Sequence, residues 1–186
     1  MKADESKWNR RYSMKEFPHD PAEIVTNNFQ LAEKGNALDI AAGNGRNSLF
    51  LADKGFEVDA VDISGVALDI IREKDKRINP IHEDLDSYQI KTDYYNLIIN
   101  VNYLQRRLFP HIKDGLKKNG VLIFQTFLEL SPDSPNYDIS KKDQFLKVNE
   151  LLHAFLSLQV IYYKEQEVRF YNGEKMRAAA LVVQKK

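Results

Sequence analysis

The sequence predicts an α/β fold: a doubly wound, mostly parallel sheet of seven strands with helices on both faces and a C-terminal antiparallel hairpin. Three observations predict it. Short apolar runs alternate with segments of helical periodicity, which is typical of parallel strands joined by crossover helices. The run 94–101 is almost unbroken in apolar character, as expected of a central strand. The last two apolar runs flank the turn-forming pair Asn172-Gly173, which favours a hairpin.

Periodicity and capping residues place the individual elements. Ser64 suits a helix N-cap and Gly55 a helix C-cap. Besides a polar N-terminal helix, helices are expected at 21–33, 47–54, 64–74, 104–116 and 142–155. Strands are expected at 36–41, 57–62, 78–82, 94–101, 121–127, 158–168 and 176–183, with a loop at 130–137 and the hairpin turn at 171–174.

Composition sets the class of protein. The 186 residues, 43% of them hydrophobic, suit one domain over 1–186, in which N-terminal helices (1–34) cover the ligand site. The formal net charge of zero argues against nucleic acid as a partner. Without cysteine there is no disulfide, thiol nucleophile or thiolate metal site. A polar N-terminus and no long apolar run lead us to expect no membrane partner and a cytoplasmic location. We further expect a monomer or homodimer.

A tight turn joins the first predicted strand to the helix that follows it. The apolar run 37–42 ends in Gly43-Asn44-Gly45. Two glycines one residue apart permit a left-handed backbone and the close approach of a ligand. Open α/β sheets bind ligands at the carboxyl ends of their strands, where this turn lies. The turn therefore predicts a nucleotide-cofactor loop.

Carboxylates at the ends of other strands narrow the choice of cofactor. Asp62 closes the second strand, where it can accept both hydroxyls of a ribose, and Asp84-Leu85 follows the third, where it suits an adenine. A dinucleotide fingerprint has a third glycine where this chain has Ser48. Asp39 would repel a pyrophosphate and attract an amino group. These features favour S-adenosylmethionine, which carries an amino group and no phosphate.

In these motifs the sequence resembles the class I S-adenosylmethionine-dependent methyltransferases, which have a Rossmann-like sheet. It is more closely similar to their tellurite-resistance branch, through residues 43–52 and the run Trp8-Asn9-Arg10-Arg11-Tyr12. The resemblance covers nearly the whole chain, but the specific motifs lie in its first half. The chain departs from the family at Ala41, where glycine is usual, and at Asn96, where an acid is common.

The resemblance implies that the N-terminal helix and the strand ends bind the cofactor. Trp8 would lie in a lid over the cofactor or close an edge of the core. Arg11 would pair with the methionine carboxylate, as a guanidinium does well, or with Asp4 or Glu5 on the surface. The residues expected at the cofactor are Trp8, Arg11, Tyr12, Asp39, Ala41, Gly43, Gly45, Asp62, Ile63, Asp84, Leu85 and Asn100.

The methyl acceptor is expected to be a small molecule, with an anion, a thiol or a chalcogen species favoured. Positioning suffices for a nucleophile that is already anionic. A neutral acceptor needs a base, for which Glu165, His111 and His19 are the candidates. The histidines have no companion ligands at metal-binding spacing, so no metal is expected. Candidates for the acceptor pocket are Arg46, Arg106, Arg169, Arg177 and Glu165. Cross-strand salt bridges explain Glu165, Arg169 and Arg177 equally well, and a solvated helix face is the alternative for Arg106.

Two other functions stay open from the sequence. A nucleotide-linked oxidoreductase or epimerase would use the same architecture, although its third glycine is absent here. A non-catalytic module that binds S-adenosylmethionine would keep the cofactor loop, and the departures at Ala41 and Asn96 are compatible with it.

Overall fold

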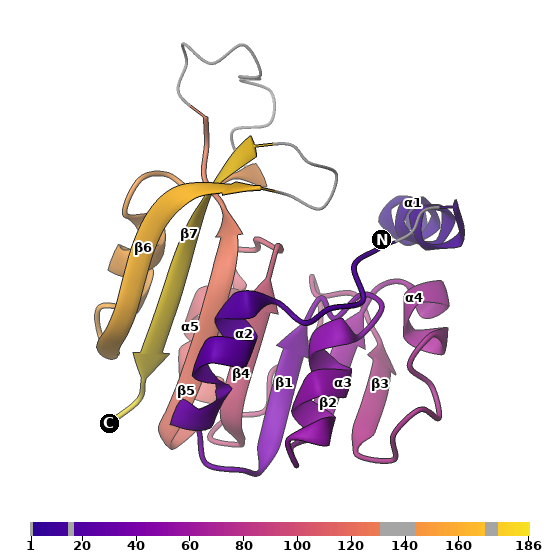
Figure 1. Ribbon diagram of the computed structural model, residues 1–186, viewed down its shortest axis with the longest axis horizontal. Helices are drawn as coiled ribbons and strands as arrows, with labels where there is room; N and C mark the ends of the chain where they lie inside the picture. The colour runs from indigo at the N-terminus through magenta and orange to yellow at the C-terminus, as the bar shows by residue number, and fades with distance from the viewer. Residues whose placement is uncertain (1, 15–16, 131–143, 170–174) are drawn as a thin grey trace.

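The computed structural model describes residues 2–14, 17–130, 144–169 and 175–186. In this part of the chain, seven strands form one sheet in the order β3-β2-β1-β4-β5-β7-β6 (Figure 1). The first five strands pair in parallel, while β7 runs antiparallel to both β5 and β6. The strands are β1 (Asn36–Ile40), β2 (Glu57–Asp62), β3 (Ile78–His82), β4 (Tyr95–Val101), β5 (Leu116–Phe127), β6 (Gln159–Arg169) and β7 (Lys175–Gln184). The predicted fold class is confirmed; the predicted turn at 171–174 lies outside the described residues.

Helices cover both faces of the sheet. In Figure 1, α2 and α3 lie in front of the strands and α5 lies behind them. The N-terminal helix α1 lies apart from these layers, above the carboxyl ends of the strands and close to α4 (Figure 1). The helices are α1 (Lys2–Met14), α2 (Glu23–Asn28), the 3₁₀ turn η1 (Phe29–Leu31), α3 (Arg46–Asp53), α4 (Gly65–Asp69), α5 (Leu108–Gly115) and α6 (Glu150–Phe155).

Two apolar clusters hold the layers together, one on each face. Alternation along β4 divides its side chains between them, because successive residues of a strand point to opposite faces. Leu97 and Ile99 pack with side chains of α2 and α3, whereas Ile98 packs with side chains of α5 and α6. This central strand is buried on both sides, as its apolar sequence predicts.

Several helices are shorter than the sequence predicts. The 21–33 segment forms α2 and then η1: the last α-type bond runs from the Phe29 N–H to the Val25 carbonyl, and the Ala32 N–H then donates to the Phe29 carbonyl at 3.2 Å, as in a 3₁₀ turn. The 64–74 segment is α-helical only to Asp69 and continues as turns to Lys74; within these turns Glu73 has a φ of 66°. In the 104–116 and 142–155 segments the helices begin only at Leu108 and Glu150; residues 142–143 lie outside the described part.

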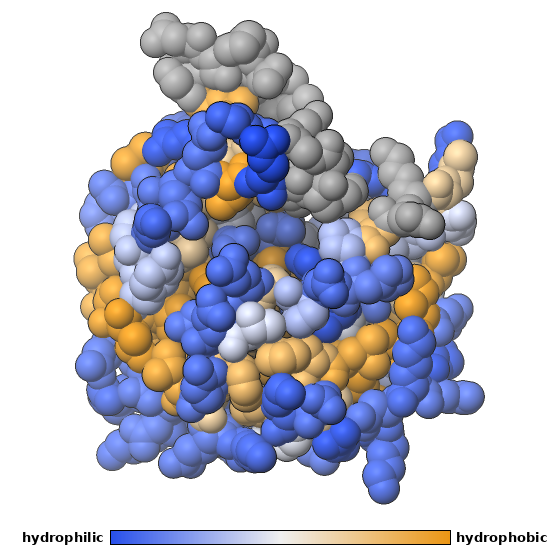
Figure 2. Space-filling model, in the orientation of Figure 1, coloured by the Kyte–Doolittle hydropathy of each residue, from blue (hydrophilic) through white to orange (hydrophobic). Residues whose placement is uncertain are grey.

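Apolar side chains are also exposed at the outer edge of the sheet. Figure 2 shows them on the left, over the region of β6. Leu156, Val160, Ile161 and Tyr162 are each more than a third exposed. β6 is one of the two edge strands of the described sheet, with β3 at the opposite edge. None of the described helices is long and apolar enough to cross a membrane.

Candidate functional site

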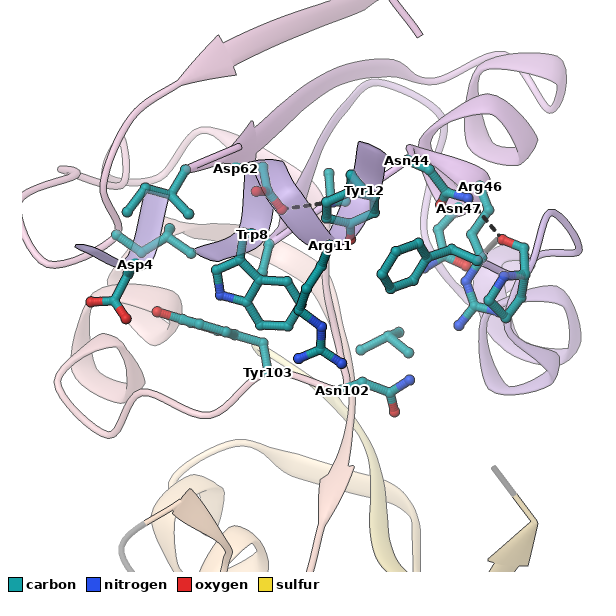
Figure 3. A pocket seen from close by; sticks show the side chains of 18 of the residues that line it. Asp4, Trp8, Arg11, Tyr12, Asn44, Arg46, Asn47, Asp62, Asn102 and Tyr103 are labelled. Atoms are coloured by element: carbon teal, nitrogen blue, oxygen red, sulfur yellow. Dashed lines mark hydrogen bonds between the residues drawn. The ribbon is translucent and has the colours of Figure 1, made fainter. Parts of the chain in front are cut away.

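A cavity of about 480 Å³ opens at the carboxyl ends of the parallel strands. Its wall combines loops that follow β1, β2, β3 and β4 with one side of α1 (Figure 3). Most of the predicted cofactor residues line it, namely Trp8, Arg11, Tyr12, Ala41, Gly43, Asp62, Ile63, Asp84 and Leu85. The structure therefore brings together side chains from four separate parts of the sequence.

The turn after β1 is tied directly to the acid at the end of β2. The Gly43 N–H donates to Asp62 Oδ2 at 2.8 Å, and the Ser64 N–H donates to Asp62 Oδ1 at 2.8 Å. Gly43 has a φ of 57°, and a Cβ at this position would lie 2.3 Å from the Tyr12 hydroxyl oxygen. The loop thus needs glycine both for its backbone conformation and for the contact with α1.

Gly45, predicted as a cofactor contact, has a different role in the structure. It is the N-cap of α3 with a φ of 70°, and a Cβ there would lie 2.3 Å from the Ile71 Cγ2. Its glycine therefore permits close packing of buried side chains and does not line the cavity. Asp39 also lies below the cavity, where its Oδ2 accepts a 2.6 Å hydrogen bond from the Ser48 hydroxyl. Ser48, which stands where a dinucleotide fingerprint has its third glycine, is thus the hydrogen-bond partner of Asp39.

The buried Asp39 carboxyl gives the protein a pH-dependent stability. Burial raises the pKa of Asp39 to about 7, against the lowering effects of the Ser48 hydrogen bond and of Arg46. An unfolded aspartate titrates near pH 4, at about 3.9. Between these values the folded chain holds more protons than the unfolded chain, so the free energy of unfolding falls as the pH rises.

We therefore expect Asp39→Asn to gain stability relative to the wild type as the pH rises from about 4 to about 7. The variant should keep this gain at higher pH. The gain is on the order of 4 kcal/mol, because the folded and unfolded pKa values differ by about 3 and a difference of 1 corresponds to about 1.4 kcal/mol. Urea unfolding at pH 4, 5.5, 7 and 8 measures it. Parallel profiles for the two proteins would show that Asp39 does not titrate in this range.

One stripe of α1 faces the cavity. Asp4, Trp8, Arg11 and Tyr12 line it, and their spacing places them on one side of a helix. The Arg11 guanidinium lies 4.6 Å from the centre of the Trp8 ring, which is a cation–π distance. In Figure 3, Trp8, Arg11 and Tyr12 lie near the middle of the view, with Asp4 to the left and Arg46 to the right.

Polar side chains after the glycine turn hold the segment that leads from α1 to α2. The Asn44 amide donates to the Pro18 carbonyl at 2.9 Å, and Arg46 Nη1 donates to the Asp20 carbonyl at 2.9 Å. Asn47 Oδ1 accepts the Ala22 N–H at 2.9 Å. The sequence singled out Arg46 for the pocket of the methyl acceptor. In the structure Arg46 lines the cavity, and its guanidinium anchors this segment.

The wall near β4 and β5 was largely missed from the sequence. Val101, Asn102 and Tyr103 line the cavity after β4, as does Phe127 at the end of β5. Asn102 has a φ of 62°, and its N–H donates to the Gln125 carbonyl at 2.8 Å. Asn100, predicted as a cofactor contact, instead donates to the Tyr103 carbonyl at 2.7 Å and so shapes this turn from below. The sequence offered one signal that could have predicted these residues. They lie at the carboxyl end of a central strand, where open α/β sheets bind ligands.

Other left-handed and polar positions complete the wall. Ala41, where the resembling family has glycine, lines the cavity with a φ of 55°, a conformation that costs an alanine about 1 kcal/mol or more. The remaining lining residues that the sequence analysis did not predict are Phe17, Pro18, Ala42, Asn44, Asn47 and Asp86. None of the lining residues in the described part of the chain is a histidine.

The other acceptor-pocket candidates lie away from the described cavity wall. Arg106 forms an ion pair with Glu150, with Nε 2.5 Å from Oε1 and Nη2 2.9 Å from Oε2. Glu165 Oε1 accepts from the Tyr163 hydroxyl and the Asn149 N–H, each at 2.5 Å. Arg177 Nη2 lies 3.8 Å from Glu165 Oε2, and Arg169 is exposed at the end of β6. The candidate bases His19 and His111 do not line the cavity either.

Comparisons with known proteins agree with this architecture. A family model described as tellurite resistance protein TehB matches residues 2–126. The putative methyltransferase YqeM of Bacillus subtilis (strain 168) is 31% identical over 121 residues, which cover 56% of this chain and 49% of YqeM. The chain thus spans about half the length of that relative.

Two solved structures share the fold. TehB from Haemophilus influenzae superposes with a TM-score of 0.75 at 19% identity, over 98% of this chain and 67% of TehB. An S-adenosylmethionine-dependent methyltransferase from Methanosarcina mazei gives a TM-score of 0.72 at 18% identity, over 89% of this chain and 98% of that protein. At these identities the likeness concerns the fold, which is that of S-adenosylmethionine-dependent methyltransferases.

Proposed function

The chain belongs to the tellurite resistance protein TehB family, and from this premise we propose that it is an S-adenosylmethionine-dependent methyltransferase acting on a small acceptor, with anions, thiols and chalcogen species favoured. The observation that carries the proposal is the convergence of Gly43, Asp62 and Asp84 on one cavity. They follow three neighbouring strands, at the edge of the sheet where open α/β folds bind ligands.

The cavity residues suit this cofactor. A volume of about 480 Å³ lies within the usual range of small-molecule sites. The Asp62 carboxylate accepts two backbone N–H groups, and a carboxylate has about four lone-pair sites, so it retains capacity for two ribose hydroxyls. Asp84 and Leu85 offer an acceptor and an apolar surface for an adenine, and Arg11 offers a guanidinium for the methionine carboxylate.

Methyl transfer requires mainly that the protein orient the acceptor atom toward the methyl group. When bound, S-adenosylmethionine supplies an activated methyl group that an electron-rich atom can take up by in-line displacement. Holding such an atom close to the methyl carbon lowers the activation free energy by several kcal/mol through orientation alone, on the order of 7 kcal/mol in favourable cases. The described lining of the cavity has two arginines, four aspartates and no histidine; with Arg11 assigned to the cofactor, Arg46 is the cation that would attract an anionic acceptor.

The sheet order divides the cavity into two ends. The ends of β3 and β2 supply the groups assigned to the adenine and the ribose, and Arg11 of α1 is the group assigned to the methionine. The next strands in the sheet are β4 and β5, so Asn102, Tyr103 and Phe127 are assigned to the acceptor. Arg46 lines the cavity from the methionine side, where its charge attracts an anionic nucleophile.

Cofactor choice is tested by thermal shift and calorimetry with S-adenosylmethionine, S-adenosylhomocysteine and NAD. We expect both adenosyl compounds to raise the melting temperature and NAD to leave it unchanged. A shift with NAD alone would favour the oxidoreductase alternative. Binding of S-adenosylmethionine without turnover of any acceptor would favour the non-catalytic module.

Acceptor choice is tested by release of S-adenosylhomocysteine with tellurite, selenite, small thiols, carboxylates and amines. We expect turnover of an anionic or thiol acceptor, and a decrease of at least about tenfold in kcat/KM for it in Arg46→Gln, since a charged hydrogen bond contributes roughly 1.5–3 kcal/mol. Arg72→Gln is the control, because Arg72 pairs with Asp69 on α4 and does not line the cavity. Turnover of amines only would contradict the anionic acceptor and direct attention to Glu165 as a base.

A further inference from the structure

Helix α1 carries cavity residues but is weakly anchored by apolar contacts. None of its side chains in the range 3–14 is fully buried, and Met14 is 70% exposed. A helix without a buried apolar face depends on specific polar contacts for its position. The contacts that orient α1 therefore decide whether Trp8 and Tyr12 lie over the cavity.

Asn9 makes such a contact on the side of α1 that faces α4. Its Oδ1 accepts a hydrogen bond from the Ser64 hydroxyl at 2.7 Å and a longer one from the Val66 N–H at 3.4 Å. Asn9 lies one residue after Trp8, so the two side chains point to adjacent sides of the helix. Glu5, one turn earlier, reinforces this side through its contact with His82, 3.3 Å from Oε1 to Nε2.

Ser64 links this contact to the cofactor loop. It is fully buried, and its hydroxyl also accepts the Ala67 N–H at 3.1 Å as the N-cap of α4. Its own N–H donates to Asp62 Oδ1, and Asp62 Oδ2 accepts the Gly43 N–H. A continuous chain of hydrogen bonds thus runs from Asn9 through Ser64 and Asp62 to Gly43. The far end of the chain returns to α1, because Gly43 lies against the Tyr12 hydroxyl.

We propose that Asn9 is a positioning residue that docks α1 over the cofactor cavity by accepting the Ser64 hydroxyl. Through this contact the placement of Trp8, Arg11 and Tyr12 is linked to the orientation of the Asp62 carboxylate. The inference rests on the proposed function, since it assigns Asp62 to the cofactor ribose. It assigns Asn9 no contact with cofactor or acceptor.

The required group is the acceptor oxygen of Asn9, and this sets the choice of variants. Asn9→Leu keeps the size of the side chain and removes the oxygen. Asn9→Asp keeps an acceptor for the Ser64 hydroxyl and the Val66 N–H. Ser13→Ala is the matched control, since Ser13 lies on the same helix and its hydroxyl donates only within it, to the Asn9 carbonyl at 3.0 Å.

The experiment measures affinity for S-adenosylhomocysteine by calorimetry and amide hydrogen exchange of 2–14 with and without that ligand. We expect Asn9→Leu to weaken binding roughly fivefold to tenfold, the value of one hydrogen bond, and to speed exchange across α1. Asn9→Asp should restore most of both properties, and Ser13→Ala should match the wild type. Thermal unfolding should be the same in the wild type, Asn9→Asp and Ser13→Ala, because α1 adds no residue to either core cluster, and lower only in Asn9→Leu, where the buried Ser64 hydroxyl loses its acceptor.

Three results would distinguish a failure of this inference from a failure of the proposed function. Wild-type affinity and exchange in Asn9→Leu would overturn the inference. Equal losses in Asn9→Leu and Asn9→Asp would also overturn it, since the acceptor oxygen would then be irrelevant. If the wild type binds no S-adenosylhomocysteine, the proposed function fails and with it the cofactor part of the inference. Exchange without ligand then still decides whether Asn9 docks α1.

Discussion

Gly43→Val is expected to abolish binding of S-adenosylmethionine. Gly43 has a φ of 57°, where a β-branched residue is strongly disfavoured, and its added Cβ would lie 2.3 Å from the Tyr12 hydroxyl oxygen. The added side chain would also crowd its own loop, in which the N–H of residue 43 donates to Asp62. Either Tyr12 and α1 move away or the loop changes shape, and both disrupt the proposed site. Calorimetry should show an affinity at least about 100-fold lower, equivalent to roughly 2.7 kcal/mol.

Gly55→Val separates this effect from backbone strain alone. Gly55 also has a left-handed φ, 93°, but an added Cβ would meet only the Lys34 side chain, at 3.6 Å or more. The substitution should lower stability by about 1–2 kcal/mol, the cost of a left-handed non-glycine residue, and leave cofactor affinity unchanged. Retained affinity in Gly43→Val would show that the loop has a structural role only.

The sequence predicted those parts of the site that follow from local pattern. A strand's end is visible in its apolar run, so Gly43, Asp62 and Asp84 were all placed at the carboxyl edge of the sheet. The topology then brings them together, because β1, β2 and β3 are neighbours in parallel. Trp8, Arg11 and Tyr12 were assigned to the site by the resemblance, and their helical spacing is consistent with one face of α1.

The parts that the sequence did not predict depend on partners distant in the chain. Gly45 lies against Ile71, Arg46 donates to the Asp20 carbonyl, and Arg106 pairs with Glu150. No local pattern distinguishes an arginine that anchors a loop from one that faces a substrate. Helix ends were similarly misjudged where a residue such as Glu73 adopts a left-handed conformation that periodicity does not reveal.

Asp62→Ala is expected to weaken cofactor binding roughly 30-fold to 150-fold, because charge-assisted hydrogen bonds to the two ribose hydroxyls would be lost at about 2–3 kcal/mol. The structure adds a second consequence that the sequence did not reveal. Without the carboxylate, the Gly43 and Ser64 N–H groups lose their acceptor in a site where Asp62 is only 7% exposed. An unsatisfied buried donor costs about 1–3 kcal/mol, so the free energy of unfolding should also fall.

Asp59→Ala is the matched control that separates the two consequences. Asp59 lies on the same strand and accepts from the Asn79 amide, the Lys91 ammonium and the Tyr95 hydroxyl, each within 2.9 Å, but it does not line the cavity. Its removal should lower stability to a similar extent while S-adenosylhomocysteine affinity stays near that of the wild type. Urea unfolding and calorimetry on both variants measure the two effects independently. If both variants lose stability and both keep wild-type affinity, Asp62 organises the loop without holding the ribose. If only Asp62→Ala loses affinity, the carboxylate that shapes the loop also binds the cofactor.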